Sequence, residues 1–274
     1  MEPSTKGKTY AVTGAASGIG RATAQLLSRT ARVFAMDVNA EGLATLASAS
    51  PQLVPVKVDL THAASVEEAT RRIGEQTSGL DGLVNCAGLN RYGAMVELPD
   101  EEFRAVMDVN VLGTYRATKA LFPLLKARLG RIVVVSSEMS TVSAPFDGVY
   151  SMSKYALEAY SDALRRELAL LGMKVAIIQP GPVKTALLQD TVPGFDRAIA
   201  SSQFAQGMRA IRDMASKEWE KSIDPAEVAE VVERALTSPR PALRYKVGND
   251  LSRAAAKLLP GSWLDAVMVR VMKG

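Results

Sequence analysis

The side chains best suited to chemistry in this sequence are a tyrosine and a lysine four positions apart, Tyr150 and Lys154. If the segment that begins at Tyr150 is helical, both side chains lie on one face, about one turn apart. Ser137 stands thirteen positions before Tyr150, at the end of an apolar run, and the intervening residues include Pro145 and Gly148, which favour a loop. We therefore predict that the three polar groups converge on one site.

Such a trio is suited to proton exchange with an alcohol or a carbonyl at neutral pH. A free tyrosine has a pKa of about 10 and is a poor base, but a nearby ammonium group favours the ionised phenol. A bound oxidised nicotinamide would add a second positive charge, and the Ser137 hydroxyl could hydrogen-bond the substrate oxygen. The alternative is a chance pairing of tyrosine and lysine on a helix surface, so the neighbouring motifs must decide.

A glycine-rich turn near the start of the chain supplies the first of these motifs. An apolar run at 9–13 is followed by a Gly-x-x-x-Gly-x-Gly turn and then by a helical pattern at 21–29. Between a strand and a helix, such a turn lets the backbone approach a pyrophosphate, which the amides and dipole at the helix start stabilise. Glycines also make ordinary turns. The candidate cofactor-binding residues here are Gly14, Ser17, Gly18, Ile19 and Gly20.

The second predicted strand, 32–37, ends in Asp37, which lies 23 positions after Gly14. That is close to the spacing at which a carboxylate receives the ribose hydroxyls of a dinucleotide. A carboxylate would repel a 2′-phosphate, and neither Val38 nor Asn39 provides a positive charge to bind one. The sequence therefore favours NAD over NADP, whereas the alternative role of Asp37 is to cap a helix or turn.

Short apolar runs alternate with helical patterns, which predicts a Rossmann-like, doubly wound parallel sheet of about seven strands with helices on both faces. Further strands are predicted at 53–60, 82–88, 131–136, 174–179 and 242–247. Further helices are predicted at 65–76, 99–129, 150–171 and 226–236, with Leu157, Leu164, Leu168 and Leu171 as one apolar stripe. No linker composition interrupts this pattern, so we interpret residues 1–274 as a single α/β domain.

Two loops of this sheet add candidates for the cofactor. Asp59, followed by Leu60, leaves the third strand and could accept a hydrogen bond from the adenine amino group. The fourth strand ends in Asn85, Cys86, Ala87 and Gly88, whose small side chains would let the backbone lie against the cofactor ribose.

Composition excludes several other classes of protein. The net charge of +4 is spread along the chain without a basic block, which argues against nucleic-acid binding. One histidine, His62, and one cysteine, Cys86, are too few for a typical zinc site, so no metal is expected. The first eight residues lack the apolar core of a signal peptide, and no apolar run is long enough to span a bilayer. We expect a soluble, cytoplasmic protein.

Taken together, the motifs resemble those of the short-chain dehydrogenase/reductase family over residues 7–250. They occur in the family's order, as Thr13-Gly-Ala-Ala-Ser-Gly-Ile-Gly20, Asn85-Cys-Ala-Gly88, Asn110, Ser137, Tyr150 with Lys154, and Pro180-Gly-Pro-Val-Lys-Thr185. The departure is Cys86, where many members have a second asparagine.

The resemblance implies a role for each of these residues. Tyr150 is the expected general acid/base, and Lys154 lowers its pKa and binds the nicotinamide ribose. Ser137 positions the substrate oxygen, and Asn110 holds a water of the proton relay. Four residues at and after the end of the sixth strand are expected to contact the cofactor: Pro180, Gly181, Val183 and Thr185. Of these, Val183 and Thr185 are expected to contact the carboxamide of the nicotinamide.

Within the family, the sequence around Tyr150 and the long tail resemble the steroid and retinol dehydrogenases, with 3-hydroxybutyrate dehydrogenases close by. A substrate lid is expected at about 186–222. Its apolar residues would suit an apolar substrate or could simply pack: Leu187, Leu188, Val192, Phe195 and Ile199. The helices at 99–129 and 150–171 form the dimer interface in the family, so a homo-oligomer is expected.

The tail, residues 251–274, has apolar side chains at helical spacing: Trp263, Leu264, Val267, Met268 and Val271. Nearby cations are Arg253, Lys257, Arg270 and Lys273. Such a helix could lie on an anionic membrane, roof an apolar pocket, or pack against its own domain or another subunit. The leading hypothesis is an NAD-dependent oxidoreductase for a secondary alcohol, and the alternatives are a hydroxy-acid dehydrogenase, a non-catalytic nucleotide sensor and a membrane-surface lipid carrier.

Overall fold

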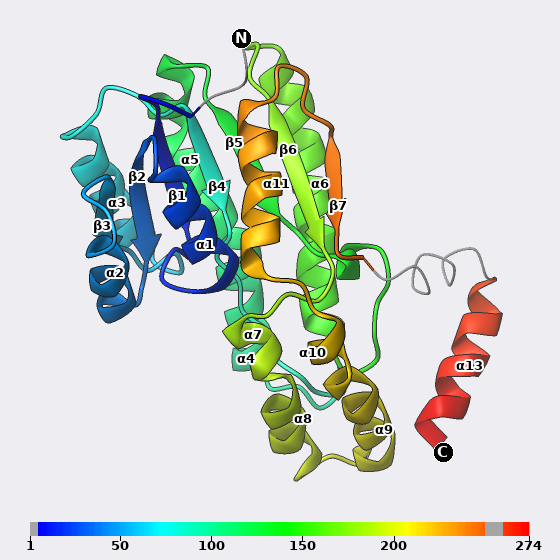
Figure 1. The fold of residues 1–274 in the computed structure, drawn as a ribbon. Coiled ribbons are helices and arrows are strands. Elements are labelled where there is room, and N and C mark those ends of the chain that lie inside the picture. Colours follow the sequence, from blue (N-terminus) through cyan, green and yellow to red (C-terminus); the bar gives the residue numbers. More distant parts are fainter. Residues whose placement is uncertain (1–4, 250–259, 274) are drawn as a thin grey trace.

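The protein is built around one parallel sheet, as seen in a computed structural model that describes residues 5–249 and 260–273 (Figure 1). The strands lie in the order β3-β2-β1-β4-β5-β6-β7, and every neighbouring pair is parallel. The strand bounds are β1 Thr9–Thr13, β2 Arg32–Asp37, β3 Leu53–Lys57, β4 Gly82–Asn85, β5 Arg131–Val135, β6 Val175–Pro180 and β7 Arg244–Val247. The sheet confirms the predicted doubly wound fold.

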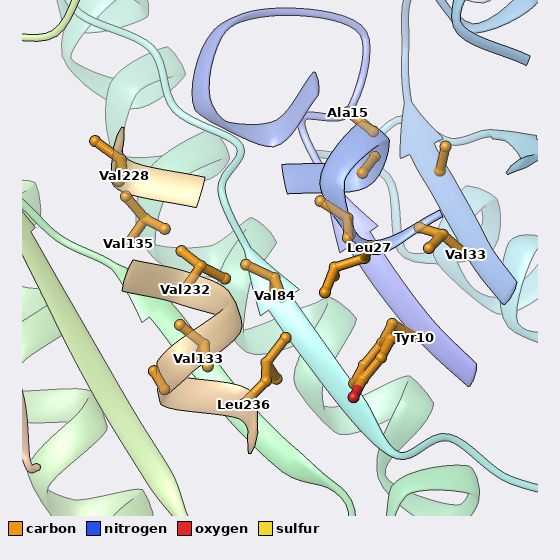
Figure 2. Close-up of a cluster of buried hydrophobic side chains, with 14 of the residues drawn as sticks. Tyr10, Ala15, Leu27, Val33, Val84, Val133, Val135, Val228, Val232 and Leu236 are labelled. Atoms are coloured by element: carbon orange, nitrogen blue, oxygen red, sulfur yellow. The ribbon is translucent and has the colours of Figure 1, made fainter. Parts of the chain in front are cut away.

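Helices cover both faces of this sheet. The first face carries α1 (Gly18–Leu27), α2 (Ala40–Ala47) and α11 (Pro225–Thr237), and the second carries α3 (Ala63–Gly74), α5 (Gly113–Ala127) and α6 (Gly148–Ala169). Successive strand residues point to opposite faces, so Tyr10 and Val12 join the first core and Ala11 joins the second. Figure 2 shows the first core, in which Leu27 and Val232 meet strand residues such as Val84.

The predicted helix at 99–129 is helical over 100–127, but its middle is a π-helical turn, which the sequence did not predict. It divides into α4 (Asp100–Met107), a π-helical turn η1 (Asp108–Leu112) and α5. Asn110 lies in the π-helical turn, where its side chain bonds the backbone of Leu89 instead of facing solvent. Widened turns of this kind often occur at functional sites. The π-helical turn therefore lies where Asn110 makes a tertiary contact, and helical periodicity reveals neither.

Other predicted boundaries shift by a few residues. Helix α1 begins at Gly18, inside the glycine turn, and α6 begins two residues before Tyr150. In the predicted apolar stripe of α6, Leu157 and Leu168 are buried, but Leu171 is 41% exposed. The stripe was wrong at that position because α6 ends at Ala169, so Leu171 follows the helix.

The segment predicted to form the substrate lid, which we call the lid, is a group of short helices beyond β6, at the lower end of the molecule in Figure 1. Its elements are α7 (Ala186–Gln189), α8 (Thr191–Ile199), α9 (Ala205–Ser216) and α10 (Glu218–Lys221). The last described helix, α13 (Gly261–Lys273), packs against α9. Arg253 and Lys257, two cations of the predicted tail, lie outside the described residues. A third apolar cluster joins these parts, with Phe195, Met208 and Ile211 at its centre.

Candidate active site

A large cavity opens where the strands of the sheet end, between the glycine turn and the lid. Its volume is about 860 Å³. Loops that follow the first six strands, β1 to β6, line it, together with residues of the lid and of α13. In open α/β sheets, ligands bind at the carboxyl ends of the strands where the strand order reverses, which here is between β1 and β4. The cavity is therefore the candidate active site.

The predicted trio meets at this cavity, and all three residues line it. Lys154 is only 4% exposed, and its Nζ lies 5.4 Å from the centre of the Tyr150 ring. The same Nζ donates a hydrogen bond of 3.1 Å to the carbonyl oxygen of Val135, which fixes the ammonium against the end of β5. Ser137 lies two residues after the end of β5, and its hydroxyl interacts with the phenol of Tyr150.

The electrostatics of the trio differ from the expectation. Burial raises the pKa of Tyr150 above its ordinary value, the carboxylate of Asp147 raises it further, and the hydrogen bond with Ser137 lowers it in part. Burial also lowers the pKa of Lys154 from 10.5 to about 8, against the opposing influence of Cys86 and Glu158. The prediction of a lowered phenol pKa is therefore not met in the protein without cofactor, where burial and Asp147 outweigh the hydrogen bond with Ser137.

The glycine turn forms a narrow cradle beside this trio. Gly14 and Gly18 have φ values of +67° and +51°, a region that other residues rarely adopt. A Cβ on Gly14 would lie 2.8 Å from the backbone of Ala87, and a Cβ on Gly18 would lie 2.9 Å from Thr185 Cγ2. No side chain caps the start of α1, so its first amides point at the space that a pyrophosphate needs. The turn fits a dinucleotide.

Gly20→Ala is expected to destabilise the protein because a Cβ at this position would lie 2.2 Å from the carbonyl oxygen of Gly14. Overpacking of this kind costs roughly 1–3 kcal/mol, so thermal unfolding should occur several degrees lower. The matched control is Gly74→Ala, at a helical glycine where an added Cβ meets nothing within 4 Å. Equal melting temperatures for the two variants would contradict this account of the turn.

Two carboxylates line the cavity at the ends of β2 and β3. Asp37 accepts hydrogen bonds of 2.9 Å from the amides of Ala16 and Asn39, so its orientation is fixed by the backbone. Asp59 accepts from the amide and the hydroxyl of Thr61, and these bonds lower the pKa of its carboxyl. Asp37 therefore has both predicted properties, a place at the cofactor cleft and a capping contact.

The other predicted cofactor contacts also line the cavity, with one exception. Ser17, Ile19, Leu60, Ala87, Gly88, Pro180, Gly181, Val183 and Thr185 are all part of its wall. Thr185 also caps α7, because its hydroxyl accepts a hydrogen bond from the amide of Leu188. The exception is Asn85, which is buried and donates to the hydroxyl of Thr118 between β4 and α5.

Asn110 does not line the cavity either, and its side chain is fully buried. Its amide oxygen accepts from the Leu89 amide at 2.7 Å, and its amide nitrogen donates to Leu89 O and to Ser153 Oγ, both at 2.9 Å. These bonds use both polar atoms of the Asn110 side chain and tie the loop after β4 to α6, one residue from Lys154. The part of Asn110 in a proton relay stays a prediction.

Some residues of the cavity wall were missed by sequence reasoning. Asn90 donates a hydrogen bond of 2.8 Å to Asp147, and the hydroxyl groups of Tyr92 and Thr191 lie 2.9 Å apart. Asn90 and Tyr92 belong to the loop after β4, where functional residues of such sheets gather, and that position was the available signal. The carboxylate of Asp147, three residues before Tyr150, was the more important omission because it raises the pKa of Tyr150.

The five apolar lid residues serve two different purposes. Leu187, Leu188 and Phe195 line the cavity, and Phe195 also packs in the third apolar cluster. Ile199 is buried in that cluster without lining the cavity, and Val192 lines a smaller neighbouring pocket of about 280 Å³. Cavity lining and packing are therefore both found in this segment, for different residues, and contact with a substrate stays a prediction.

Comparison with known proteins identifies the family. Residues 8–195 match the family model described as short chain dehydrogenase. The chain belongs to this family. Members of this family are nicotinamide-dependent oxidoreductases, and the cradle, cavity and trio described above are consistent with that chemistry.

Characterised relatives place this short-chain dehydrogenase in the retinol and steroid branch. It is 37% identical to human "Retinol dehydrogenase 16" over 94% of its own length and 85% of that protein. It is 35% identical to rat "17-beta-hydroxysteroid dehydrogenase type 6", again over 94% of its length and 85% of that protein.

A solved structure has the same fold. A short chain dehydrogenase from Burkholderia cenocepacia, in complex with NADP, matches with a TM-score of 0.73 and 27% identity, covering 97% of this chain and 98% of that one. None of the described helices of this short-chain dehydrogenase is both long and apolar enough to cross a membrane.

Proposed function

We propose that this short-chain dehydrogenase interconverts a secondary alcohol and its ketone with NAD(H) as the cofactor. The observation that carries the proposal is the meeting of Tyr150, Lys154 and Ser137 at the end of β5, in the same cavity as the glycine cradle. A dinucleotide whose pyrophosphate lies on the glycine turn would place its nicotinamide ring near these side chains, as the relatives' chemistry requires.

The side chains of the chain would handle the proton while the cofactor, when bound, accepts or donates the hydride. Ser137 donates a hydrogen bond to the substrate oxygen, and Tyr150 removes the hydroxyl proton in oxidation or returns it in reduction. The ammonium of Lys154 donates one of its three N–H groups to the carbonyl oxygen of Val135. Two N–H groups remain, which would serve the phenol and a ribose hydroxyl. The positive charge of oxidised nicotinamide would lower the pKa of Tyr150 when oxidation begins.

An apolar substrate of the steroid or retinoid kind is the class that the cavity wall supports best. Apolar side chains from the lid line the same cavity as the trio, among them Leu187, Leu188 and Phe195. A second candidate is a short hydroxy acid, which is favoured by Lys217 and Lys221 in the same wall, since an ammonium group could pair with a carboxylate. Activity with hydroxysteroids, with retinol, a primary alcohol that is oxidised to an aldehyde, and with 3-hydroxybutyrate, followed by NADH absorbance, separates the two. Turnover of none of them would count against the proposal.

Asp37 supports a preference for NAD, although the Burkholderia structure is a complex with NADP. The carboxylate is held by two backbone amides, and Val38 beside it is exposed and uncharged. We expect the protein to bind NADH at least tenfold more tightly than NADPH, and the double variant Asp37→Ser, Val38→Arg to reverse the order. Fluorescence titration with both cofactors measures this, with Asn39→Ala as a neighbouring control. Tighter binding of NADPH by the unaltered protein would overturn the assignment.

We further propose a cytoplasmic homo-oligomer. The surface of α5, η1 and α6 exposes a group of large apolar side chains, which suits contact with a second subunit: Leu112, Tyr115, Met152 and Tyr155. Membrane contact through α13 is also a proposal, supported by the exposure of Trp263 and Val267. A nucleotide sensor without catalysis finds less support, because the tyrosine and lysine are both present at the cavity.

A further inference from the structure

Helix α13 forms part of the wall of the candidate active site. Leu264 and Met268 line the cavity together with lid residues such as Phe195, Ile211 and Met214. They lie four positions apart, on one face of α13, and the next residues of that stripe, Val271 and Met272, are also half-buried. The face of α13 that meets the rest of the molecule is therefore apolar and reaches the substrate space.

The positions just before Leu264 and Met268 are also apolar, but they lie on the exposed side of α13. Trp263 is 66% exposed and Val267 is 54% exposed, and neither lines the cavity. Leu264 and Met268 therefore have neighbours on α13 that are similar in size and chemistry but do not touch the site. This pattern provides matched control positions on the same helix.

The position of α13 is set by its contact with α9. Gly207 of α9 lies at the crossing, where an added Cβ would approach Met272 Cβ at 3.3 Å and the Phe146 ring at 3.4 Å. The side-chain amide of Gln206 donates a hydrogen bond of 2.8 Å to the carbonyl oxygen of Lys273, near the end of α13. Met268 and Met272 pack on the third apolar cluster beside Met208, which is fully buried. A small residue at Gly207 thus permits the close packing of α13 that completes the wall.

We propose that α13, through Met268 and Leu264, closes the apolar end of the substrate cavity and determines how large an apolar alcohol the enzyme binds well. The inference rests on the proposed function and goes beyond it, because it assigns substrate selectivity to the tail rather than to the lid alone. A long apolar substrate contacts Met268, whereas a short one occupies only the space beside Tyr150 and Ser137.

The test compares two alcohols of the same class, 2-butanol and 2-decanol. Met268→Ala should lower kcat/KM for 2-decanol roughly tenfold or more, since the loss of one to two methylene contacts in an apolar pocket has about that effect. The value for 2-butanol should change less than about twofold. Gly207→Leu, which displaces α13 without removing a wall residue, should give the same selective loss. Val267→Ala, on the exposed face, should change neither value.

Failure of the inference can be told apart from failure of the proposed function. Binding of 2-decanone measured by calorimetry needs no turnover, and Met268→Ala should weaken it roughly tenfold, while NADH affinity stays the same. If the protein oxidises no alcohol but this binding difference is found, the proposed role of α13 in the cavity wall is supported and the proposed reaction is wrong. The inference is overturned by equal 2-decanone binding in the two proteins, by no binding at all, or by equal losses for both alcohols.

Discussion

Tyr150→Phe is expected to lower kcat for alcohol oxidation by about 10³-fold, with little change in stability or in cofactor affinity. General acid/base catalysis contributes about 10²–10⁴-fold to a reaction, and the phenol hydroxyl is the proposed proton acceptor. Phenylalanine keeps the ring, which lies 5.4 Å from Lys154 Nζ, so the surrounding packing is preserved. Steady-state kinetics together with NADH titration separate catalysis from binding.

Tyr155→Phe is the matched control for this experiment. Tyr155 lies on the same helix, one position after Lys154, but its side chain is exposed and does not line the cavity. The same loss of a hydroxyl should leave kcat within about twofold. If Tyr150→Phe folded, bound NADH and kept full turnover, another group would have to transfer the proton.

Lys154→Met is expected to abolish most activity and at the same time to stabilise the protein. Burial lowers the pKa of Lys154 from 10.5 to about 8, so the charged form is disfavoured in the folded state, and this costs about 3 kcal/mol at neutral pH. Methionine removes that cost, although Val135 loses the hydrogen bond from Lys154 Nζ, which offsets about 1 kcal/mol. The net gain at pH 7 is roughly 2 kcal/mol.

The stability gained by Lys154→Met should depend on pH. Between pH 8 and 10.5 the unfolded chain binds more protons at Lys154 than the folded one, so the stability of the unaltered protein rises with pH in that window. Below pH 8 Lys154 is protonated in both states, so the full free-energy cost of burying its charge applies. Above pH 10.5 it is neutral in both states, and this cost vanishes. Urea unfolding at pH 7 and pH 10 should therefore give a smaller difference between the two proteins at the higher pH. A destabilised variant at pH 7 would contradict the lowered pKa of Lys154.

The sequence predicted the parts of the site that depend on local pattern. The glycine turn, Asp37 and the pair Tyr150 and Lys154 were placed correctly at the cavity because the alternation of strands and helices dictates where each loop lies. Parallel strands bring their carboxyl ends to one edge, so motifs far apart in the chain meet there. That rule needs no knowledge of side-chain contacts.

What the sequence did not predict depends on contacts between distant residues. The π-helical turn lies where Asn110 hydrogen-bonds Leu89, 21 positions earlier, and helical periodicity carries no trace of these bonds. The raised pKa of Tyr150 results from burial and from Asp147, neither of which can be read from the spacing of tyrosine and lysine. In the same way, the spacing in the tail predicted α13, but its docking at Gly207 required the structure.

The proposed reaction transfers hydride from the carbinol carbon of a secondary alcohol to nicotinamide. The most direct test incubates the protein and NAD with a hydroxysteroid that carries deuterium at that carbon, and analyses the NADH by mass spectrometry. We predict NADH that carries one deuterium, formed by the unaltered protein and at least about 10²-fold more slowly by Tyr150→Phe. If NADH forms without deuterium, or if Tyr150→Phe forms labelled NADH at an undiminished rate, the proposed mechanism is contradicted.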